Sequence, residues 1–147
     1  MSHDERYSVL FDLFLANAAA STLLAPAMRS SGLTPAQYAE YSLLRTEGPL
    51  TVTEFATRSN RPLSTASDTL RAMEQRGHVT RSRHPDDGRA WALRLTPAGR
   101  AAHSRARRRF RVAAAQVSTR LGRHEDDVRR ALGLLAAVCV DATADLR

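Results

Sequence analysis

The stretch Thr53–Gly99, TEFATRSNRPLSTASDTLRAMEQRGHVTRSRHPDDGRAWALRLTPAG, decides the fold of this chain of 147 residues. Amphipathic segments alternate along it with turn-forming residues, which predicts two short helices at a sharp turn, followed by a β-hairpin. In order, the expected elements are a helix over 53–59, a turn over 60–62, a helix over 63–76 closed by Gly77, a hairpin with its tip at 84–89, and a helix that starts within 95–99.

Two helices at a sharp turn, backed by a basic hairpin, form a winged helix-turn-helix. This arrangement is typical of proteins that read duplex DNA, with the second helix in the major groove. The apolar residues of that helix share one face and are expected to pack inward: Leu63, Ala66, Leu70 and Met73. The candidate DNA contacts on the helix are Ser64, Thr65, Ser67, Asp68 and Arg71. Small hydroxyls permit close approach, and arginine reaches a guanine edge or a phosphate. The alternative is a solvated helix face.

The hairpin is the second candidate DNA contact. Pro85 and Gly88 shape its tip, Arg89 is expected to enter a minor groove, and Asp87 is expected to hold the Arg89 guanidinium. Candidate phosphate contacts on the stems are Arg81, Arg83 and Arg94. Alternation on the returning strand places Trp91, Leu93 and Leu95 on one face. The segment 50–52 is a candidate short strand beside the hairpin. The alternative is a solvated basic hairpin.

At these positions the chain resembles the MarR family of bacterial transcription regulators. That family has an Asp-Pro-x-Asp-x-Arg-like wing and a Leu-Thr-x-x-Gly exit. The matching residues are Pro85, Asp87 and Arg89 in the wing and Leu95, Thr96 and Gly99 at the exit. The resemblance covers essentially the whole chain. It implies a mainly α-helical fold with a small β-hairpin wing, in a homodimeric, ligand-responsive repressor that binds double-stranded DNA.

Two departures from the family pattern bear on DNA binding. Asp68 stands where family members often have a basic residue. It would accept from cytosine N4, bond Arg71 and aim it, or weaken the affinity for DNA. Ser59 and Arg61 replace turn positions that are usually apolar, and Leu63 is the candidate to supply the missing packing.

The helices on either side of the winged lobe carry more apolar surface than that small lobe can cover. Ser2 and Glu5 are spaced as a capping box for a first helix, Pro26 should kink or interrupt it, and Thr34–Pro35 should start the next one. The last helix has a heptad-like stripe of Val128, Leu132, Leu135, Cys139, Ala142 and Leu146. We therefore expect a homodimer of one MarR-like domain over 1–147. Its winged lobe spans 34–96, and its helical dimerisation region spans 1–32 and 97–147.

Arginines crowd the segment 105–111 of the helix after the wing. Such a run is typical of a solvated face. The alternative is that some of these side chains line a crevice between the dimerisation and DNA-reading regions, where the resemblance implies that anionic aromatic effectors bind. The candidate ligand-binding residues are then Phe11, Phe14, Tyr38, Tyr41, His103 and Arg107.

Composition restricts the compartment and the chemistry. The net charge of +7 and the pI of about 11.1 favour a polyanionic partner, although all 22 basic residues are arginine, which also reflects a GC-rich genome. The one cysteine, the start without signal-peptide features, and the lack of an apolar run of about 18 residues predict a cytoplasmic protein with no membrane partner. Cys139 is expected to be an inert packing residue rather than a redox sensor.

No spacing of histidines, acids or nucleophiles is typical of a metal site, a cofactor site or a catalytic centre, so we expect no cofactor and no enzyme. Two other functions compete with the regulator. One is a DNA-binding protein of low specificity without an effector, which would show steep salt dependence and little sequence preference. The other is a helical small-molecule-binding protein that has lost DNA binding.

Overall fold

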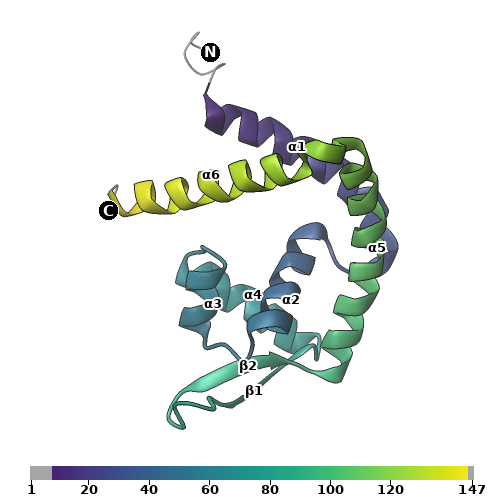
Figure 1. Ribbon diagram of the computed structural model, residues 1–147. Helices are drawn as coiled ribbons and strands as arrows, with labels where there is room; N and C mark the ends of the chain where they lie inside the picture. Colours follow the sequence, from purple (N-terminus) through teal and green to yellow (C-terminus); the bar gives the residue numbers. More distant parts are fainter. Residues whose placement is uncertain (1–7, 146–147) are drawn as a thin grey trace. The chain divides into compact units, whose positions relative to one another are not determined.

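The computed structural model describes residues 8–145, which are mainly helical with one two-stranded antiparallel sheet (Figure 1). This confirms the predicted fold class. The elements are α1 (Val9–Met28), η2 (Arg29–Ser31), α2 (Pro35–Glu47), α3 (Val52–Arg58), α4 (Leu63–Gln75), β1 (Val79–Arg83), β2 (Trp91–Leu95), α5 (Pro97–Leu121), η3 (Gly122–His124) and α6 (Glu125–Asp145). The chain divides into two compact units, one ending at Ala113 and the other beginning at Ala114.

Side-chain caps determine where α2 and α3 begin. The Thr34 hydroxyl accepts from the Gln37 amide at 3.2 Å, and Gln37 Oε1 accepts from the Thr34 amide at 3.0 Å. Thr51 and Glu54 form the same reciprocal pair, at 3.2 and 2.7 Å. Each box satisfies two amides that the start of a helix leaves unpaired. The second box starts α3 at residue 52, one position before the predicted start.

The core of the first unit lies among α2, α3, α4 and the hairpin. Tyr41, Phe55, Leu70 and Leu93 are fully buried there. Leu50 pairs with Leu93 through two backbone hydrogen bonds of 3.0 and 2.7 Å, which confirms the predicted pairing with the hairpin at Leu50 alone. The predicted strand over 50–52 does not extend further, because Thr51 caps α3 and Val52 is its first residue. The hairpin extends away from the helices that hold its base (Figure 1).

The structure corrects the inward packing predicted for Leu63 and refines the predictions for Trp91 and Pro26. Leu63 is 55% exposed, because it is the first residue of α4 and lies one turn before the buried Ala66. Trp91 is 51% exposed and does not share the buried environment of Leu93, since it lies at the end of β2 nearest the hairpin tip. Helix α1 includes Pro26 and ends two residues later, where it tightens into η2.

Helix α1 leaves most of its apolar side chains exposed. Val9, Leu10, Phe14 and Leu15 are between 51% and 72% exposed, and only Met28 is buried. The segment Val9–Ser31 is long and apolar enough to cross a membrane by length and composition, with a mean hydropathy of 1.5. The sequence predicts no membrane-spanning segment, because polar residues interrupt every apolar run in this helix. The mean hydropathy remains high in spite of these polar residues. A soluble protein would have to cover such a helix with another apolar surface.

The second unit has a similar surface. None of the described residues of α6 is buried, and Val128, Leu132, Leu134 and Val138 are 38% to 69% exposed. The predicted break before α6 is confirmed at Gly122, which has a φ of 52°. Of the sequence features expected here and in the first helix, Leu146, Ser2 and Glu5 lie outside the described residues.

Candidate nucleic-acid interface

Helix α4 separates an inward face from an outward one, as expected for a recognition helix. Ala66, Leu70 and Met73 are buried against the core. The candidate DNA contacts on the other face are exposed at Ser64, Thr65, Asp68 and Arg71 and half-buried at Ser67. The helix ends at residue 75, and Gly77 turns the chain toward the hairpin with a φ of 70°.

The turn between α3 and α4 is held by hydrogen bonds where the family resemblance expects apolar packing. Asn60 adopts a left-handed conformation with a φ of 51°, which asparagine tolerates better than most residues. The Ser59 hydroxyl donates to the Phe55 carbonyl at 2.6 Å, and Arg61 forms an ion pair with Glu40 of α2 at 3.1 Å. These contacts, rather than Leu63, fix the turn.

Asp68 and Arg71 form an ion pair of 2.9 Å along α4. This is one of the three outcomes that the sequence left open for Asp68. Both side chains are more than 60% exposed, so the pair adds little stability. Its consequence is geometric, because the carboxylate restricts the directions in which the Arg71 guanidinium can extend.

The hairpin is attached to the recognition helix through Arg81 and Glu74. Arg81 donates two hydrogen bonds to the Glu74 carboxylate, at 2.7 and 3.0 Å, and this contact raises the pKa of the Arg81 guanidinium. Bidentate pairs of this kind are more directional than single ion pairs. Arg81 therefore orients β1 relative to α4, in addition to its predicted contact with a phosphate.

Arg83 is held over the Trp91 ring, with its guanidinium carbon 4.3 Å from the ring centroid. The two residues face each other in the hairpin register, and Arg83 also donates to the Arg89 carbonyl at 3.3 Å. Alternation along the strand placed Trp91 on one face with Leu93 and Leu95 but did not predict this contact with Arg83. The available signal was an aromatic residue directly opposite an arginine across two strands.

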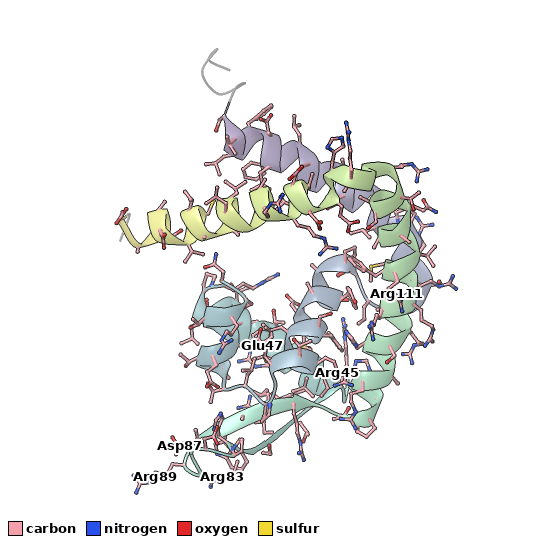
Figure 2. The ribbon with its side chains drawn as sticks, viewed as in Figure 1. Arg45, Glu47, Arg83, Asp87, Arg89 and Arg111 are labelled. Atoms are coloured by element: carbon pink, nitrogen blue, oxygen red, sulfur yellow. The ribbon has the colours of Figure 1, made fainter. Side chains whose placement is uncertain are left out.

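The tip of the hairpin is ordered by Asp87, though not in the way predicted. Asp87 Oδ1 accepts from the backbone amide of Arg89 at 3.0 Å and does not hold the Arg89 guanidinium. A carboxylate two residues before an amide forms this local turn readily. Arg83, Asp87 and Arg89 gather at the end of the hairpin, where the Arg89 side chain extends outward (Figure 2).

The candidate ligand-binding residues fall into separate environments. Tyr41 is fully buried, and its hydroxyl lies 2.8 Å from His78 Nδ1. Tyr38 stacks on His103 at 5.3 Å between ring centroids, and His103 Nε2 lies 3.1 Å from the Ser42 hydroxyl. Burial, and then the nearby positive charges of arginines, lower the pKa of both histidines.

The remaining members of this set are Phe11, half-buried, and Phe14 and Arg107, both exposed. Of this set, Tyr41 lines a cleft of about 150 Å³ between α2 and α4, which the other members do not line. The crevice predicted for an effector therefore stays a prediction.

Comparison with known proteins places this geometry in a family. The model of the MarR family matches residues 33–91. A probable transcriptional regulator from Pseudomonas aeruginosa is 30% identical, with a TM-score of 0.71 over 90% of this chain and 98% of that one. The transcriptional repressor CouR, bound to a 23-mer DNA duplex, is 28% identical, with a TM-score of 0.77 over 93% and 96% of the two chains.

The M. tuberculosis transcriptional regulator MosR, in complex with DNA, is 25% identical, with a TM-score of 0.78 over 92% of this chain and 98% of that one. No curated protein sequence matches this one. The helix-turn-helix, the wing and these relatives together show that the chain belongs to the MarR family, whose members are DNA-binding transcriptional regulators and not enzymes.

Proposed function

We propose that this regulator is a homodimeric repressor that binds a pseudo-palindromic operator and releases it in response to a small ligand. The observation that carries the proposal is the Arg81–Glu74 contact, which holds the wing at a defined orientation to the recognition helix. Two DNA-contacting elements fixed in one lobe are suited to reading a major groove and the adjacent minor groove together.

Each DNA contact has an assigned part in this proposal. Ser64, Thr65, Ser67, Asp68 and Arg71 read the major groove. Arg89, ordered by Asp87, enters the minor groove, while Arg81 and Arg83 approach phosphates on either side. The net charge of +7 assists association with DNA at long range.

The dimer is proposed from the exposed apolar residues of α1 and α6. The winged lobe over 34–96 is assigned to DNA, and the helical regions over 1–32 and 97–147 are assigned to contacts between subunits. A second copy of the chain covers the apolar faces and makes a membrane partner unnecessary for α1. The protein then acts in the cytoplasm, where its operator is accessible.

The effector is proposed to be a small anionic aromatic molecule bound near Phe11, Phe14, Tyr38, Tyr41, His103 and Arg107. Support comes from a second structure of CouR, 26% identical to this chain, which is bound to p-coumaroyl-CoA. The stacked Tyr38 and His103 rings offer an aromatic surface, and Arg107 offers a positive charge.

The decisive experiment is selection of binding sites from random duplex DNA by the purified protein. The expected result is a pseudo-palindrome with half-sites about one helical turn, ~10 bp, apart. A single asymmetric half-site would contradict the homodimeric repressor. Weak sequence preference with a steep salt dependence would instead support a low-specificity DNA-binding protein. Absence of DNA binding would support a ligand-binding protein.

A further inference from the structure

A cavity of about 310 Å³ lies between η2 and α5, within the first unit of the chain. It is distinct from the proposed effector residues, none of which lines it. Its walls are formed by Ser30, Ser31, Arg105, Arg108, Arg109 and Val112. Three of these six residues carry a full positive charge at neutral pH.

The helix geometry explains why these arginines meet at one cavity. Successive residues of an α-helix are about 100° apart, so positions 105, 108, 109 and 112 lie along one flank of α5. The face that packs on the core carries Ala102, Ala106 and Ala113. Arg107 and Arg111 lie on the other flank, and Arg111 is marked on α5 in Figure 2.

The three guanidinium groups lack a balancing charge within the part of the chain that the structure describes. No carboxylate among residues 8–145 forms an ion pair with Arg105, Arg108 or Arg109. Arginines three and four positions apart on a helix repel one another. A bound anion would relieve this repulsion, and the cavity is where the three charges converge.

On the η2 side, the cavity is lined by two serines, of which only Ser30 has a hydroxyl available as a hydrogen-bond donor. The Ser31 hydroxyl is buried and occupied, because it donates to the Leu33 carbonyl at 3.0 Å and accepts from the Leu33 amide at 3.2 Å. The Ser30 side chain is exposed at the cavity wall, and no hydrogen bond joins its hydroxyl to another described residue. Gly32, with a φ of 82°, then turns the chain away toward α2.

This combination suits a phosphate group better than a carboxylate. Guanidinium groups bind phosphate oxygens in a bidentate manner, and a phosphate presents more oxygens and more charge than a carboxylate. Val112 is the one apolar residue of the lining, so little surface is available for an aromatic ring. A volume of about 310 Å³ is at the lower end for small-molecule sites and leaves room for a modest organic group beyond the phosphate.

We propose that the η2–α5 cavity is a binding site for a phosphorylated small molecule. None of its lining residues belongs to α4 or the hairpin, so the site does not compete for the candidate DNA-contacting side chains. The inference goes beyond the proposed function, because this binding needs neither an operator nor the aromatic effector.

The test is calorimetric titration of the full-length protein with inorganic pyrophosphate in a chloride buffer without DNA. The expected result is saturable binding of one pyrophosphate per chain. The variant Arg108→Gln/Arg109→Gln should weaken that binding at least 10-fold, and Ser30→Asp, which places a negative charge at the wall, should weaken it as well. The matched control is Arg111→Gln, an exposed arginine on the opposite flank, which should bind pyrophosphate within about two-fold of the parent.

Circular dichroism identifies any variant that fails to fold, and Ser30→Asp tests the site without removing an arginine from α5. Non-saturable binding by the parent, or equal weakening by Arg111→Gln, would overturn the proposal in favour of diffuse attraction to a basic helix. Unchanged pyrophosphate binding by Arg108→Gln/Arg109→Gln, with weaker binding of random duplex DNA, would also overturn it and assign these arginines to the DNA backbone.

Discussion

The winged lobe and the helices α1 and α6 differ in how their apolar side chains are covered. In the lobe, Phe55, Leu70 and Leu93 are fully buried by the chain itself. On α1, Phe14 is 72% exposed, and on α6, Leu134 is 69% exposed. Exposed apolar surface of this kind marks interaction sites in soluble proteins. DNA reading and subunit association should therefore be separable by mutation.

The largest effect on stability is expected when a large side chain is removed from the core of the winged lobe. Phe55→Ala removes a fully buried ring and should lower the free energy of unfolding by about 3–5 kcal/mol. Urea denaturation followed by circular dichroism measures the change. The control is Leu63→Ala, at a residue that is 55% exposed, which should change stability by less than about 0.5 kcal/mol. Equal losses for the two variants would show that Leu63 is covered in solution.

A charged residue introduced on α6 is expected to weaken the dimer rather than the fold of the winged lobe. Leu135→Arg places an unpaired guanidinium in the proposed subunit contact and should raise the dimer dissociation constant at least ~100-fold. The helical content of the winged lobe should persist. Sedimentation velocity compares this variant with Asp141→Arg, which changes a residue that is already charged and exposed. A parent protein that sediments as a folded monomer at micromolar concentration would rule out the dimer.

The wing tip should affect DNA affinity without affecting association. Arg89→Ala should weaken operator binding by about 1–3 kcal/mol, because the proposed function places this guanidinium in the negative potential of the minor groove. Asp87→Ala should cause a smaller loss, since it removes only the hydrogen bond to the Arg89 amide. The double variant should lose less than the sum. Fluorescence anisotropy at fixed salt measures the four affinities, and strict additivity would assign Asp87 an independent role.

A smaller effect, on the pH dependence of the free energy of unfolding, is expected from His103 of α5, which lies against Ser42 of α2. Burial, with the charges of Arg45 and Arg107, lowers the pKa of His103 below its usual 6.5. Around pH 6.5, His103 binds a proton more readily in the unfolded chain than in the folded one. The neutral His103 therefore contributes its full stabilisation above pH 6.5, and the free energy of unfolding falls as the pH decreases below that value. His103→Gln, which can keep a hydrogen bond to Ser42, should flatten this dependence in urea unfolding at several pH values. An unchanged slope would assign the effect to His78, whose pKa is lowered in the same direction.

Replacement of the cysteine is expected to have no effect on the response of DNA binding to oxidation. Cys139 is half-buried on α6 within the proposed subunit contact. Cys139→Ser should therefore leave operator binding as insensitive to mild peroxide as in the parent. Release of the parent, but not of the variant, from DNA after oxidation would show that the thiol is a sensor after all.

The helix-turn-helix could be predicted from the sequence because its signals are local. The cap that starts α2, the glycine after α4 and the turn residues of the hairpin each act within a few positions along the chain. The capping box of α3 is equally local, although the predicted start of that helix lay one residue late. The Asp68–Arg71 pair could be proposed for the same reason, since residues three apart on a helix are neighbours. The family motifs rest on these same local residues.

Contacts between distant residues were decided only by the tertiary structure. Arg81 meets Glu74 because β1 returns beside α4, and the η2–α5 cavity joins residues more than seventy positions apart. The exposure of Leu63 and Trp91 depends on where the core ends, which periodicity alone does not reveal. Sequence determined the elements and their inward faces, because hydrogen bonding and periodicity are local. The tertiary structure decided which charged groups on different elements are paired, because that pairing depends on how the elements pack.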